Sequence, residues 1–289
     1  MDNVTRKMDV WMRRRARPLD LARWNYLQGR SPSREVLAAL AAFQNADGGF
    51  GHALEPDSWN PLSSPMQTWR ATHILREIGC FDPGEPLVRA LRDYLLVTNA
   101  GGKWKALIPS NDEYPHAPWW HYRAEEEFWG YNPGAALLGF LARVGALLEP
   151  EIHLSLAALL EQKEPQMHEL PRFLDLYTDL SAVGWNGAEL RAVKEKLSND
   201  LQKTVVTDPA LWFEYVLRPS MVFSTENQEF HEPFALAIKQ EQQWLIETME
   251  EDGSWPISWE WGQYPEAFPI AREWWKGDHI INYAEFLKW

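Results

Sequence analysis

Cysteine is almost absent from this chain. Cys80 is the single cysteine among 289 residues, so no intrachain disulfide framework is available, and this composition fits a reducing compartment. Residues 1–27 carry Arg13, Arg14, Arg15 and Arg17 with no apolar run after them. We therefore expect neither a signal peptide nor a membrane-spanning helix at this end, and we predict a cytoplasmic protein without a membrane partner.

Positive charge is also scarce. The chain has 28 Lys and Arg against 41 Asp and Glu, for a net charge of −13. Such a charge repels nucleic acid and anionic membrane surfaces, so the expected partner is a small molecule that is neutral or cationic. Strand patterns are weak throughout, and P-loop and dinucleotide fingerprints are missing. Nothing in the composition indicates an oligomeric state.

Tryptophan, in contrast, is abundant. The 17 Trp outnumber the 12 Phe and the 9 Tyr. Indole rings of this number fill gaps between packed helices, or they line a cavity for a sugar, a cation or an isoprenoid chain. Several of them cluster in segments broken by Gly or Pro, where filling a core is less automatic, as at Trp119-Trp120 and Trp274-Trp275.

A short turn motif recurs along the chain. Residues 47–50 read Asp-Gly-Gly-Phe, residues 252–255 read Asp-Gly-Ser-Trp, and residues 101–104 read Gly-Gly-Lys-Trp. Glycine allows a positive φ, and Asp bonds the backbone two residues on. The spacing fits units of about 50 residues, which predicts an array of helical hairpins. We expect Gly48 or Gly49 at positive φ and Phe50 packed between helices.

Apolar spacing and Pro and Gly signals locate the expected helices. An N-cap at Ser31 or Ser33 starts the first, and Ser63 or Ser64 caps the second before Pro65. The predicted helices cover residues 33–43, 65–78, 85–97, 150–162, 187–203 and 232–249, with further starts near Pro133, His168, Asp208 and Pro269. The longest irregular stretch, residues 101–132, is rich in aromatics and is predicted to form a cap over a cavity mouth.

These patterns resemble a known superfamily. A Gln followed by Gly and an aromatic at a helix end resembles the QW-type repeat of squalene cyclases and the repeat of protein prenyltransferase β-subunits. Residues 43–72, FQNADGGFGHALEPDSWNPLSSPMQTWRAT, resemble a group of uncharacterised bacterial proteins of that superfamily. The resemblance implies an all-α fold, an α/α toroid built from repeated helical hairpins, with residues 1–289 as one domain. It does not by itself imply a reaction.

The departures from those families exclude their chemistry. The chain has no Asp-x-Asp-Asp string, with which squalene cyclases protonate their substrate, and no Asp-Asp-x-x-Asp string for diphosphate-bound magnesium. Prenyltransferases hold zinc with Asp, Cys and His, whereas Cys80 follows a helix-ending glycine in an expected hairpin turn. We therefore predict no cofactor.

The strongest candidates for chemistry are Glu55 and Asp57, two carboxylates in a Glu-Pro-Asp segment that could serve as acid and base. Alternatively, one of them caps a helix or pairs with Arg70. Residues 51–64 and residues 101–132 each precede a helix that begins with Pro, and in an α/α ring equivalent helix starts share one rim. The predicted ligand-binding residues are therefore His52, Trp59, Gln67, Arg70, Trp119, Trp120, His121, Trp129 and Asn132.

Two histidines of the cap, His116 and His121, lie near carboxylates such as Asp112. Their spacing of five residues fits neither a helical i,i+4 pair nor a zinc signature, so the prediction is that they hold no metal.

The predicted function is that of a small-molecule enzyme, or former enzyme, of the terpenoid cyclase/prenyltransferase-like toroid type. Its ligand would be polar or sugar-like and bound in an acidic, Trp-lined central cavity, because the polar side chains there are too many for a hydrocarbon. Two alternatives stay open, a noncatalytic ligand-binding protein and a carbohydrate-active hydrolase or lyase. The second requires two carboxylates about 5–10 Å apart. The sequence alone does not decide whether the chain is an enzyme.

Overall fold

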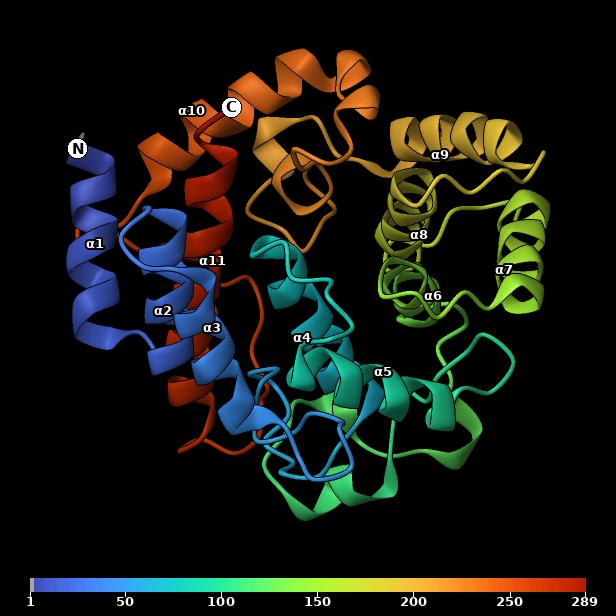
Figure 1. The fold of residues 1–289 in the computed structure, drawn as a ribbon. Coiled ribbons are helices and arrows are strands. Elements are labelled where there is room, and N and C mark those ends of the chain that lie inside the picture. Colours follow the sequence, from blue (N-terminus) through green and yellow to red (C-terminus); the bar gives the residue numbers. More distant parts are fainter. Residues whose placement is uncertain (1–2) are drawn as a thin grey trace. The chain divides into compact units, whose positions relative to one another are not determined.

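The computed structural model describes residues 3–289, and its helices are drawn in Figure 1. Regular structure within this range consists of 11 α-helices and eight short 3-10 helices, and the described residues form isolated β-bridges but no strand. The predicted all-α class is thereby confirmed. The chain divides into two compact units, unit 1 with Met1–Ala42 and Val205–Trp289, and unit 2 with Phe43–Thr204.

Unit 1 contains five α-helices: α1 (Asn3–Arg15), α2 (Pro18–Leu27), α3 (Ser33–Leu40), α10 (Ala235–Thr248) and α11 (Phe268–Phe286). Helix α2 packs against α3 and α11, and α1 packs against α11. Buried ion pairs join α2 to α11, because Arg23 contacts both Asp20 and Asp278. The sequence patterns did not predict α1 and α2.

The prediction of a helix that starts near Asp208 is wrong. Only a 3-10 turn forms there, at Pro209–Leu211, with the Asp208 carboxylate accepting a hydrogen bond from the Ala210 N–H. The indole N–H of Trp212 then donates to the Val206 carbonyl at 2.8 Å, which folds the chain back on itself. A second proline begins another short 3-10 turn at Pro219–Met221. Local side-chain bonds to the backbone compete here with helix propagation.

Unit 2 contains the other six α-helices: α4 (Pro65–Glu77), α5 (Pro86–Thr98), α6 (Gly134–Arg143), α7 (Glu149–Glu161), α8 (Leu170–Ala182) and α9 (Leu190–Thr204). Helix α6 packs most closely against α8, and α7 and α8 both contact α9 (Figure 1). Gly139 permits this approach, since a Cβ there would lie 2.5 Å from the Asp179 carboxylate. All candidate site residues belong to unit 2.

Helix starts agree with the sequence signals in one case and differ in another. The Oγ of Ser64 accepts a hydrogen bond from the Gln67 N–H and caps α4, as predicted. The first predicted helix is instead capped by Pro32, without a side-chain bond, so neither Ser31 nor Ser33 is its N-cap. Pro32 is already extended, at φ −77° and ψ 158°, and supplies the non-helical conformation that an N-cap needs.

The Asp-Gly turns of the two units share one hydrogen-bond pattern. In the first, the Asn45 N–H donates to the Gly49 carbonyl and the Gly48 N–H donates back to the Asn45 carbonyl. Residues 250–254 repeat both bonds. Gly48 has φ +89° and Gly253 has φ +93°. Phe50 is fully buried. The turn motif is therefore structural, as predicted.

No helix within residues 3–289 combines the length and the apolar character needed to cross a membrane.

Candidate functional site in the cap of unit 2

Residues 51–64, here the buried loop, lie against the cap, residues 101–132. Ser58 and His116 form an antiparallel β-bridge, and the Ala117 N–H donates to the Asp57 carbonyl at 2.8 Å. Extended backbone segments pair readily in this way because each leaves N–H and C=O groups to be satisfied. The two segments that the sequence marked as one site are therefore in contact.

The side chain of Gln67 holds the buried loop in shape. Its Oε1 accepts from the Glu55 N–H at 3.1 Å, and its Nε2 donates to the carbonyls of Ser58 and Asn60, both at 3.1 Å. All three bonds are buried, and Gln67 itself is 1% exposed. Buried backbone groups need such partners. Gln67, predicted as a ligand contact, thus has a structural role that occupies its amide.

A narrow crevice lies between the buried loop and the cap. It has no room for a water molecule. Its lining combines both segments with the start of α4: Glu55, Ser58, Ser64, Met66, Gln67, Ala106, Asn111 and Trp120. The indole N–H of Trp120 is buried and has no hydrogen-bond partner. Glu55 and Trp120, predicted as catalytic and ligand-binding residues, therefore line one crevice.

The tryptophans of the cap differ in exposure. Trp120 is 5% exposed and stacks on Trp129, with ring centroids 5.2 Å apart and planes at 21°. Asn132 forms a β-bridge with Trp129, and its N–H donates to the Trp129 carbonyl at 2.9 Å. Trp119, the residue before Trp120, is 36% exposed. The cap thus exposes Trp119 to solvent and buries Trp120, which stacks on Trp129.

The other candidates of the buried loop are placed by local bonds. His52 is exposed, and its Nε2 lies 2.9 Å from the Oδ1 of Asn45 in the Asp-Gly turn. The indole N–H of Trp59 donates to the Pro56 carbonyl at 3.1 Å. Asp57 is 2% exposed, deeper than Glu55 at 6%. None of these bonds directs His52 or Trp59 toward the crevice.

Arg70 belongs to a cluster of charged residues shared by α4 and α8. The guanidinium of Arg172 lies over the Trp69 ring, 4.5 Å from its centroid, and donates to the His73 Nε2 at 3.0 Å. Burial lowers the pKa of Arg172, and the positive charges of Arg76 and Arg70 lower it further, whereas Asp175 raises it. The structure thus links Arg70 electrostatically to α8, a connection that no sequence signal indicated.

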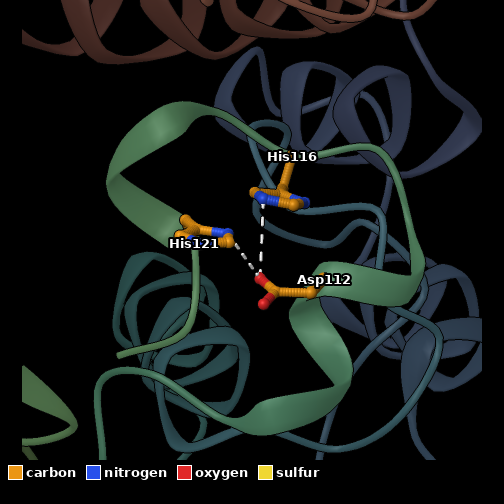
Figure 2. Close-up of side chains that lie close together, drawn as sticks. All are labelled: Asp112, His116 and His121. Atoms are coloured by element: carbon orange, nitrogen blue, oxygen red, sulfur yellow. Dashed lines mark ion pairs between the residues drawn. The ribbon is translucent and has the colours of Figure 1, made fainter. Parts of the chain in front are cut away.

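The cap also gathers three side chains with metal-ligating atoms, shown in Figure 2. The Asp112 Oδ1 lies 2.9 Å from the His121 Nδ1 and 3.8 Å from the His116 Nε2. The three ligating atoms lie within 4.8 Å of one another. The prediction that the cap holds no metal was based on the five-residue spacing of His116 and His121. Helical spacing could not have indicated this cluster, because Asp112 lies in a 3-10 helix that ends at Glu113, before His116.

Comparison with known proteins gives no relative: no family model, no curated protein and no solved structure matches this chain.

Proposed function

We propose that this protein binds a small polar or sugar-like molecule between the buried loop and the cap of unit 2. The observation that carries the proposal is the indole N–H of Trp120, which is buried without a hydrogen-bond partner in a residue that lines the crevice. A buried donor left unsatisfied costs about 1–3 kcal/mol. A ligand hydroxyl that accepts this hydrogen bond removes the cost, and this gain favours the bound state.

The other groups around the crevice suit the same kind of ligand. Glu55 supplies a carboxylate, which accepts hydrogen bonds from hydroxyls, and Asn111 and Ser58 supply further polar atoms. The Trp120–Trp129 pair and the exposed Trp119 supply flat apolar faces on which a sugar ring packs. Because the crevice has no room for water, binding requires the cap to move away from the buried loop.

Catalysis is the second candidate function, and one observation favours it. Glu55 and Trp120 line the same crevice, so a hydroxyl bound there would lie near Glu55, whose carboxylate would act on it as a base or an acid. Asp57 would be its partner two residues on, as in a carbohydrate-active hydrolase or lyase.

The repeats carry the rest of the proposal. We propose that the chain is a cytoplasmic α/α toroid of the terpenoid cyclase-like type, and that its partner is a small molecule and not nucleic acid.

A thermal-shift screen of monosaccharides and disaccharides tests the proposal. We expect at least one sugar to raise the melting temperature of the wild type, and we expect the shift to vanish in Trp120→Phe, which removes the N–H but keeps an aromatic ring. Trp104→Phe is the matched control, because the Trp104 N–H already donates to the Leu95 carbonyl. A sugar shift that survives in Trp120→Phe would contradict the proposed site.

Two further variants in the same experiment test catalysis. Glu55→Gln and Asp57→Asn keep the shape of each side chain and remove its charge. If the bound sugar is also hydrolysed or cleaved by elimination, both variants should still show the thermal shift while turnover falls by at least about 100-fold, the lower range for general acid–base catalysis. Binding without turnover in the wild type would identify a noncatalytic ligand-binding protein.

A further inference from the structure

We propose that Asp112, His116 and His121 of the cap bind one divalent transition-metal ion. The three ligating atoms already lie within 4.8 Å of one another, with the Asp112 Oδ1 2.9 Å from the His121 Nδ1 and 3.8 Å from the His116 Nε2. Bond lengths of about 2.0–2.2 Å to a central ion require the ligating atoms to be about 3–3.5 Å apart. The cluster therefore needs only a small contraction to bind an ion (Figure 2).

The backbone of the cap orients each ligand. The Nδ1 of His116 lies 2.6 Å from the Tyr114 carbonyl, and as a donor it carries the ring hydrogen, so the lone pair is on Nε2, the nitrogen nearer Asp112. A histidine that ligates a metal typically donates its other N–H in this way, which fixes the ring. His116 is also held by its bridge to Ser58 and is 3% exposed.

A second set of bonds fixes the other two ligands. The Asn111 Nδ2 donates to the Trp120 carbonyl at 3.0 Å, which ties together the residues just before Asp112 and His121. The Tyr122 N–H donates to the Asp112 Oδ1 at 2.9 Å. Residues 111–112 and 120–122 are therefore held in register, and the His121 ring lies parallel to the His116 ring, at 10°. The convergence of the three side chains is imposed by the fold of the cap.

The donor set indicates which ions fit. Two neutral imidazoles and one carboxylate suit zinc and the other transition ions that prefer nitrogen, and they suit calcium and magnesium poorly because these prefer all-oxygen sites. Asp112 and His121 are 37% and 56% exposed at their side chains. Three protein ligands, of which Asp112 and His121 are exposed and His116 is buried, leave at least one coordination position for water or another ligand, as in catalytic zinc sites.

The cluster adjoins the crevice of the proposed ligand site without being part of it. Asn111 and Trp120 line the crevice, and each immediately precedes a metal-ligating residue. The metal proposal stands on the cluster alone. If no sugar binds, the metal proposal is unaffected. If no metal binds, the proposal of a sugar site at Trp120 is unaffected.

The test is titration of the tag-free full chain, freed of metal with a chelator, with Zn²⁺ by calorimetry and with Co²⁺ by visible absorption. We expect one saturable site, with Co²⁺ bands of a four- or five-coordinate ion. Loss of an outer partner alone weakens metal binding about 10–100-fold. Removal of a direct ligand in His121→Ala or Asp112→Asn should therefore raise the dissociation constant by more than about 100-fold.

The matched control is His153→Ala. His153 lies in the same unit, is 55% exposed, and pairs with Glu189 at 2.7 Å, but it belongs to no three-residue cluster of this kind in the described part of the chain. Its removal should leave the titrations unchanged. The absence of saturable one-to-one binding in the wild type, or equal affinity in wild type and His121→Ala with both chains folded by circular dichroism, would overturn the proposal.

Discussion

The buried loop and the cap are both rich in polar residues, yet they use them in opposite ways. In the buried loop and the adjoining start of α4, Asn60 and Gln67 are almost fully buried, and their amides bond to backbone and side-chain groups of the protein. In the cap, Asp112 and His121 point their polar atoms at each other near the surface, and the Trp120 N–H has no partner. The amides of Asn60 and Gln67 maintain the fold, whereas we propose that Asp112, His121 and the Trp120 N–H of the cap bind ligands.

This difference explains why the site was only partly predictable. The sequence marked both segments because each precedes a helix beginning with Pro, and the structure brings them together. A sequence does not reveal which amide is satisfied internally, since Gln67 finds its partners only after residues 55–60 fold over it. The sequence therefore gave no reason to treat Gln67 and Trp120 differently, and both were predicted to bind a ligand.

The helical class and most helix positions followed from local signals. Glycine turns and the Ser64 cap act within a few residues, so their effects could be read directly from the sequence. The structure of the region after Asp208 could not be read in this way, because Pro219 and the hydrogen bond of Trp212 to Val206 redirect the chain. Helices α1 and α2 were not predicted. Helix α1 buries Met8, Trp11 and Met12 on one face, and α2 is joined to α11 by the buried ion pair of Arg23 with Asp278.

The largest effect is expected at the turn that anchors the buried loop. Gly48→Ala forces a positive φ on alanine and places its Cβ 2.1 Å from the Ala90 carbonyl oxygen. Gly79→Ala is the matched control. Gly79 also has a positive φ, +64°, but no atom would lie within 4 Å of a Cβ added there. We expect the control to lose about 1 kcal/mol of unfolding free energy and Gly48→Ala to lose about 3 kcal/mol or more.

Urea denaturation measures both losses. Equal losses in the two variants would show that the Ala90 contact relaxes freely, and the turn would then not be a rigid anchor.

The next effect concerns the amide that shapes the buried loop. Gln67→Ala removes three buried hydrogen bonds and leaves the carbonyls of Ser58 and Asn60 without this donor. We expect a loss of about 1–3 kcal/mol of unfolding free energy. Gln202→Ala, at an exposed position of α9, should change it by less than about 0.5 kcal/mol. If both variants unfold at the same urea concentration, the loop does not depend on Gln67.

The smallest effect on stability is expected in the cap. His121→Ala removes an exposed imidazole whose ion pair with Asp112 lies at the surface. An exposed pair contributes about 0–1 kcal/mol, so metal-free His121→Ala should unfold close to the wild type. A loss as large as that of Gln67→Ala would show that the cap side chains also maintain the fold, and the contrast between loop and cap would fail.

The most direct test of this contrast is a ¹H–¹⁵N spectrum of the full chain labelled at its indole nitrogens, with signals assigned by single Trp→Phe variants. On addition of a sugar that raises the melting temperature, the Trp120 signal should shift most, with smaller shifts at Trp119 and Trp129. The signals of Trp212 and Trp255 should stay in place, because both residues belong to unit 1 and their indoles already donate to backbone carbonyls. Shifts at Trp212 or Trp255 with an unmoved Trp120 signal would contradict the account.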